Sequence, residues 1–124
     1  MKLIMTIGAI LAFLSVAFGA FGAHVLKERL GAHYLSIFET GVQYQMVHSL
    51  GLILIGILAL TAFRGSAGLL QWAGLLMIAG IVLFSGSLYA LSISRINLLG
   101  IITPFGGIAF LISWALVVVA FLKA

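Results

Sequence analysis

The 124-residue chain has no cysteine and no aspartate, and it carries few charges of either sign. Without cysteine it has no disulfide, no thiolate metal site and no cysteine nucleophile. Its two carboxylates, Glu28 and Glu39, are too few to favour a paired-acid mechanism. Charged residues make up 6% of the chain, against about 25% in an ordinary soluble domain. Hydrophobic residues make up 65%, which excludes both a soluble domain and a disordered chain.

The basic residues are scattered, and long uncharged stretches lie between them. No run of them could follow a nucleic-acid backbone, so we expect no nucleic-acid partner. Each uncharged stretch has the length of about 20 residues that a membrane-spanning helix needs. The apolar runs are continuous, which favours helices over a β-barrel. The sequence therefore predicts an all-α integral membrane protein. It forms a four-helix transmembrane bundle in a single domain, residues 1–124, with spans at about 3–23, 42–63, 67–91 and 104–122.

The ends of these spans carry further signals. The N-terminus is similar to a signal peptide, since Lys2 and an apolar stretch are followed by the small residues Ala20, Gly22 and Ala23. That stretch has 21 residues, more than the roughly 7–15 of a signal core, so we expect the first span to be retained. Thr103 followed by Pro104 predicts the start of the last helix. Three basic residues fall on each side of the membrane, so the positive-inside rule sets no orientation.

The segment His24–Gly41 joins the first two predicted spans. Its apolar residues Leu35 and Phe38, with Val42 beyond, recur at spacings of three and four. This spacing predicts a short amphipathic helix that lies in the membrane interface.

Small residues recur at helical spacing along every span. Such stripes let helix backbones approach each other closely in lipid. They pack the helices within one chain, or one of them joins two copies in a homo-oligomer. The stripes contain Gly8, Ala12, Ser15, Gly19 and Gly22 in the first span, Ser49, Gly56 and Ala59 in the second, Ala73, Gly80, Ser87 and Ser94 in the third, and Gly106, Ser113 and Ala120 in the fourth.

The three histidines, His24, His33 and His48, are predicted at or near the same membrane face, with Glu39 between the last two. Together they offer four metal ligands, which suits a histidine-ligated metal or haem site. They lack the HxxxH or HxH spacing of a metal motif, so hydrogen-bonded interfacial histidines are the simpler interpretation. We expect no metal and no cofactor.

Tyr44, Gln45 and His48 share one broad helix face at the edge of the second span. Polar groups in a membrane are costly unless they are paired. We expect these side chains to bond the third span or the start of the fourth and so to pin the bundle. In the alternative, they line a functional site. The expected partners are Ser85, Ser87 and Tyr89 of the SGSLYA segment, or the backbone near Thr103 and Pro104.

Catalytic patterns are poor. Ser85 lacks the GxSxG context of a nucleophile elbow, and Gly106–Gly107 has no lysine or strand that would make a phosphate loop. We therefore expect no enzyme.

Four motifs in a fixed order indicate a family resemblance: GAFGAHVLK at 19–27, TGVQYQMVHS at 40–49, LFSGSLYAL at 83–91 and TPFGG at 103–107. On these the chain resembles the uncharacterised small membrane protein family labelled domain of unknown function 423, which includes transmembrane protein 256 of eukaryotes. The resemblance covers nearly the whole chain. It implies a compact multi-span protein, in bacteria in the plasma membrane, and brings no activity, substrate or cofactor. The family usually has glycine before the tryptophan of the fourth span, where this chain has Ser113 before Trp114. The signature positions are His24, Tyr44, Gln45, His48, Ser85, Ser87, Tyr89, Thr103 and Pro104.

The leading hypothesis is a non-enzymatic structural, assembly or accessory protein whose partners are membrane lipid, a second copy or another membrane protein. One alternative is a small transporter or channel with a polar vestibule around His24, Glu39, Gln45 and His48. The histidine-ligated metal or haem binder is a further alternative.

Overall fold

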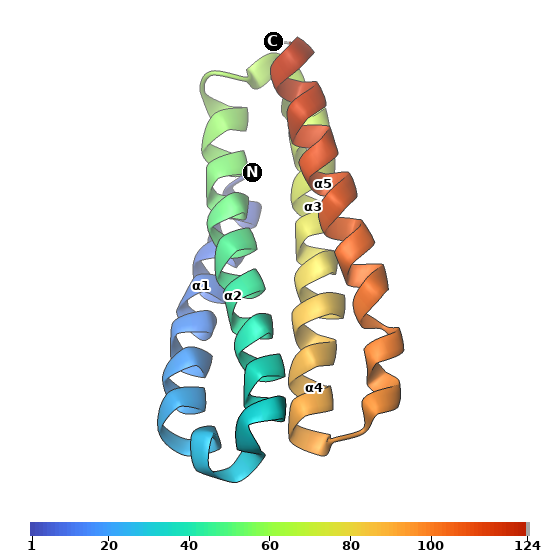
Figure 1. Cartoon of the computed structure of the whole chain (residues 1–124). Helices are drawn as coiled ribbons and strands as arrows, with labels where there is room; N and C mark the ends of the chain where they lie inside the picture. The colour runs from blue at the N-terminus through green and yellow to red at the C-terminus, as the bar shows by residue number, and fades with distance from the viewer. Residues whose placement is uncertain (124) are drawn as a thin grey trace.

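The computed structural model describes residues 1–123, which form helices joined by short turns and include no strand (Figure 1). The α-helices and the short helical segments between them follow one another along the chain. They are α1 (Lys2–Phe21), the π-helical η1 (Gly22–Leu26), α2 (Lys27–Leu60), the 3₁₀ turn η2 (Arg64–Ser66), α3 (Ala67–Gly80), the π-helical η3 (Ile81–Ser85), α4 (Gly86–Ser94), the 3₁₀ segment η4 (Asn97–Ile101) and α5 (Thr103–Lys123).

The chain reverses direction at Gly31, inside α2. Gly31 has φ 76° and ψ 167°, a conformation that is essentially restricted to glycine. Residues 2–30 therefore form one arm and residues 32–60 a second arm that runs back beside it (Figure 1). Contacts between the arms confirm the antiparallel pairing, since a Cβ on Gly8 would meet Leu52 and one on Gly22 would meet Phe38.

Three helical stretches are long and apolar enough to cross a membrane: Lys2–Leu60, Arg64–Ser94 and Asn97–Lys123. The predicted count of four spanning helices is therefore not confirmed. The difference arises at Gly31, because the reversal takes a single residue and the first two predicted spans are assigned to one helical stretch. The later boundaries also shift. The elements α3, η3 and α4 form one continuous helical column, here called the third column, which continues to Ser94. Helix α5 begins at Thr103, one residue before Pro104.

The predicted interfacial helix over His24–Gly41 is wrong. The structure divides this segment between the ends of the two arms, with Gly31 at the turn. Its apolar residues pack against neighbouring helices instead of lying flat on a surface. Phe38, which is 3% exposed, joins Leu26 and Leu30 in a small core beneath the turn.

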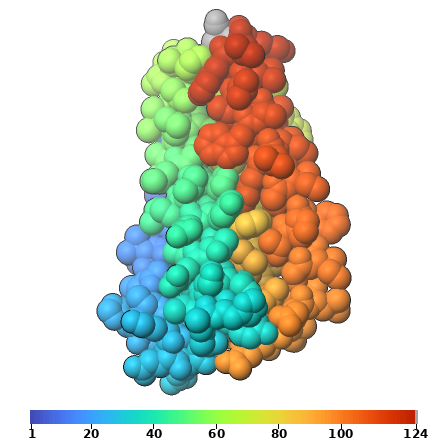
Figure 2. All heavy atoms as spheres, viewed as in Figure 1, coloured from blue at the N-terminus to red at the C-terminus, as the bar shows by residue number. Residues whose placement is uncertain are grey.

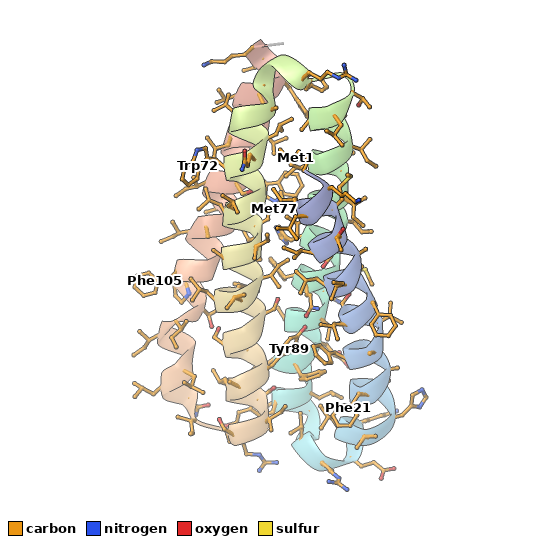
Figure 3. The ribbon with its side chains drawn as sticks, turned by 180° about the vertical axis from the view of Figure 1, so that it is seen from behind. Met1, Phe21, Trp72, Met77, Tyr89 and Phe105 are labelled. Atoms are coloured by element: carbon orange, nitrogen blue, oxygen red, sulfur yellow. The ribbon has the colours of Figure 1, made fainter. Side chains whose placement is uncertain are left out.

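The core fills the space between the arm pair and the α3–α5 pair. Figure 3 shows Met77 directed into this space and Trp72 directed away from it. Leu52, Ile55, Leu70 and Met77 are almost completely buried there. Large apolar side chains such as Leu3, Leu111 and Leu122 remain more than 70% exposed, as expected of a surface in contact with hydrocarbon.

Arg95 joins the two halves at the end of the bundle that contains Gly31. It adopts a left-handed conformation after α4, and its guanidinium donates to the carbonyls of Arg29 and Leu30 at 3.1 and 3.4 Å. These carbonyls lie at the end of the first arm, where helical partners are missing. The Tyr34 hydroxyl donates to Asn97 Oδ1 at 3.2 Å across the same junction.

Most of the small residues of the predicted stripes are buried within the bundle. Gly8, Ser15, Gly22, Ser49, Gly56, Ala59, Ala73, Gly80, Ser87, Gly106, Ser113 and Ala120 are buried, Ala12 and Gly19 are half-buried, and Ser94 is exposed. A Cβ on Gly80 would overlap the Phe110 ring, and one on Gly106 would overlap the Phe84 backbone. Glycine at these two positions therefore allows α5 to approach the third column closely.

Candidate functional site

A layer of polar side chains crosses the bundle around Gln45, which is 2% exposed. Its Nε2 donates to the Leu11 carbonyl of α1 at 2.8 Å, and its Oε1 accepts from the Tyr89 hydroxyl at 2.5 Å. Figure 3 shows Tyr89 projecting from α4 toward the arm pair. One amide thus links α1, α2 and α4.

His48 lies one turn further along α2 and faces α5. Its Nε2 accepts from the Trp114 indole N–H at 3.0 Å, and its Nδ1 lies 2.7 Å from the Tyr44 carbonyl. Because an indole only donates and a carbonyl only accepts, this pairing assigns the neutral tautomer with the proton on Nδ1. Both ring nitrogens are therefore engaged. The ring also stacks on Phe110, with centroids 3.6 Å apart.

Buried serines make the remaining links between helices. Ser85 donates to the Gly41 carbonyl at 2.7 Å, Ser113 to Ala73 at 2.6 Å and Ser66 to Ala120 at 3.1 Å. Each bond joins two helical elements that are distant in the sequence, so the hydroxyls stabilise the bundle.

The start of α5 is joined to α4 in the same way. The Ser87 and Thr103 hydroxyls lie 2.6 Å apart, while Ser87 also donates to the Phe84 carbonyl. Pro104 is exposed at the outer surface.

Two expectations about this layer are wrong. The hydrogen-bond partner of His48 is Trp114 of α5, and Ser85 bonds the Gly41 carbonyl instead. Tyr44 is 42% exposed and lies outside the buried layer that contains Gln45. The reason is rotation about the helix axis: Gln45 faces α1 and α4, whereas Tyr44 and His48 face α5.

The residues of the predicted vestibule do not gather at one place. Gln45 and His48 are buried inside the bundle, whereas His24 and Glu39 are exposed on its outside. Within residues 1–123 no three histidine, aspartate or glutamate side chains lie close enough to hold a metal ion.

Trp114 is a member of the polar layer that the sequence did not predict. An indole N–H inside an apolar span requires an acceptor, and this requirement was the available signal. The rotation of α5 that brings it to His48 depends on the close contacts at Gly80 and Gly106.

A groove lies beside His48, between α2, η3 and α5. It has a volume of about 460 Å³, and its walls include Tyr44, Phe84, Phe110 and Trp114. Figure 2 shows this side of the molecule, where yellow atoms of the third column are visible between green α2 and orange-red α5.

The hydrogen bonds of the buried layer are all made within the protein. Across residues 1–123, every buried side-chain nitrogen and oxygen has a hydrogen-bond partner within the protein. The layer therefore fixes the helices relative to one another and leaves no buried side-chain donor or acceptor unpaired.

Known proteins resemble this chain along its whole length. The model of the family described as "Protein of unknown function (DUF423)" matches residues 18–107. The chain is 52% identical to the UPF0382 membrane protein YwdK of Bacillus subtilis, with 99% of this chain and 98% of that protein covered. It is 46% and 45% identical to UPF0382 membrane proteins of Staphylococcus epidermidis and Staphylococcus aureus, with the same coverage. No solved structure matches it.

Proposed function

Because the chain belongs to the DUF423 family of membrane proteins of unknown function, we propose that it is a multi-pass, non-enzymatic component of a plasma-membrane assembly. Its action then depends on the surface that it offers to lipid and to partner helices, and not on reactive groups inside the bundle.

The lengths of the arms support four crossings. Residues 2–30 and 32–60 each have 29 residues, or about 43 Å of helix at 1.5 Å per residue, which exceeds the roughly 30 Å of a hydrocarbon core. Charged residues lie near the ends of the arms. Lys27 and Arg29 lie beside the Gly31 turn, and Lys2 lies at the opposite end of the first arm.

One observation carries the non-enzymatic proposal. Within residues 1–123, every buried side-chain nitrogen and oxygen already has a hydrogen-bond partner in the protein. A general base or nucleophile must be free to reach a substrate. His48 is the strongest candidate, and both of its nitrogens already bond Tyr44 and Trp114.

We expect the protein to be extracted from the membrane as part of a complex. Native mass spectrometry of material extracted directly into lipid nanodiscs, at its natural expression level, measures this. The expected mass is a multiple of the 13.1 kDa protomer, or one protomer with a stoichiometric membrane partner. A population that consists of single protomers with lipid alone would contradict the proposal.

A further inference from the structure

The groove between α2, η3 and α5 has the size and position of a ligand site. Its volume of about 460 Å³ falls within the range of about 300–1,000 Å³ that small-molecule pockets occupy. A second hollow, lined by Gln43, Tyr44, Val47 and His48, adjoins it across Tyr44. Tyr44 therefore forms a wall of both hollows.

The groove lies near the middle of the bundle. Tyr44 is about 18 Å along the second arm from residue 32, and the whole arm is about 43 Å long. With the bundle in a bilayer, the opening faces hydrocarbon. A ligand of this site therefore arrives through the lipid and is itself lipid-soluble.

Three of the aromatic rings around the groove lie in nearly one orientation, whereas Phe84 is tilted by 38° from Tyr44 and Trp114 by 58° from His48. The planes of His48 and Phe110 differ by 12°, those of Tyr44 and His48 by 10°, and those of Tyr44 and Phe110 by 21°. Phe84 packs against Tyr44 with centroids 4.5 Å apart. Parallel rings favour a planar, aromatic-like guest that can stack in an offset arrangement.

The polar groups at the rim define the rest of the guest. The Tyr44 hydroxyl and the Gln43 amide are exposed and bond no other group within residues 1–123. Both are hydrogen-bond donors, and a donor in hydrocarbon is costly until it meets an acceptor. His48 offers a guest no donor or acceptor, because its two nitrogens are already bonded and the side chain is buried against Phe110.

We propose that this groove binds the planar, carbonyl-bearing head group of a membrane quinone. The guest ring stacks on the Tyr44 ring, which is 42% exposed and lies nearly parallel to the buried His48–Phe110 pair, and its carbonyl oxygens accept from the Tyr44 hydroxyl and the Gln43 amide. A saturated acyl chain fits the chemistry less well, since it offers neither a flat face nor an acceptor at this depth.

The backbone around the groove keeps it open. Phe84 is carried by the π-helical η3, and such π-helical turns are frequent at functional sites. Gly107 leaves room on the opposite wall, since a Cβ there would be 4.0 Å from Phe84 Cδ2. A larger side chain at Gly107 would therefore enter the groove without displacing a backbone.

The test is a titration of the full chain in nanodiscs with decylubiquinone, followed by fluorescence quenching. Trp72→Phe provides the background, so that Trp114 at the groove is the only tryptophan, and its emission is excited selectively. We expect saturable quenching. Gly107→Leu is expected to weaken it at least tenfold and Tyr44→Phe about tenfold, while Gly68→Leu, whose Cβ meets no atom within 4 Å on α3, leaves it unchanged.

Three results would overturn the proposal. The first is quenching that rises linearly and equally in all variants. The second is saturable binding that Gly107→Leu leaves intact, since the site would then lie elsewhere. The third is displacement of the quinone by a saturated fatty acid at equal concentration, which would identify an acyl chain as the occupant. If Gly107→Leu fails to fold, Tyr44→Phe decides, because it removes only one oxygen.

Discussion

Replacing Gly106 by alanine is expected to destabilise the bundle by about 1–3 kcal/mol, the usual cost of forcing an extra group into a packed interior. A Cβ at this position would lie 2.7 Å from Phe84 Cα and closer still to the Phe84 amide nitrogen. These are backbone atoms of η3, which cannot rotate out of the way as a side chain can. The free energy of unfolding, measured by titration with sodium dodecyl sulfate, tests this.

Gly107→Ala is the matched control. It lies on the same helix, gains the same helix propensity and meets Phe84 Cδ2 only at 4.0 Å. We expect it to be neutral or slightly stabilising, by up to about 1 kcal/mol. Equal stabilities of the two variants would show that α5 does not approach η3 as the structure places it.

Gln45→Leu is expected to cost about 1–3 kcal/mol, because it leaves the buried Tyr89 hydroxyl without a partner and removes the bond that ties α2 to the Leu11 carbonyl of α1. Tyr89→Phe removes one of these bonds and should cost less, near the 0.6 kcal/mol that hydrogen bonds within membranes average. The same unfolding titration measures both variants.

The double variant tests whether the Gln45 and Tyr89 side chains interact directly. Since Gln45 and Tyr89 bond each other, the loss in Gln45→Leu/Tyr89→Phe should be smaller than the sum of the single losses. Tyr34→Phe serves as a comparison, because its hydroxyl bonds Asn97 at the surface and should be additive with Gln45→Leu. Strictly additive losses for Gln45 and Tyr89 would refute the link between α2 and α4.

Composition and continuous apolar runs were sufficient to predict a helical membrane protein, and the four motifs were sufficient to predict its family. The segment His24–Gly41 was predicted to join the first two spans, but the position of the turn within it, at Gly31, was not. The turn depends on the backbone conformation of one glycine, which the sequence pattern does not indicate.

The partners within the polar layer depended on helix rotation, which sequence spacing constrains weakly. Spacing placed Gln45 and His48 on one broad face, whereas the two side chains contact different neighbours. Trp114, on α5, is 66 residues from His48 along the chain. Only the approach of α5 at Gly80 and Gly106 brings the two together, and that depends on three-dimensional packing.

The proposed arrangement of four crossings is tested most directly by the side of the membrane on which each turn lies. The chain has no cysteine, so single cysteines can be introduced by Lys2→Cys, Ala32→Cys, Gly65→Cys and Asn97→Cys, all at exposed positions, and labelled in intact cells with an impermeant maleimide. We predict that positions 2 and 65 react on one side and positions 32 and 97 on the other. Labelling of positions 32 and 65 from the same side would contradict the account.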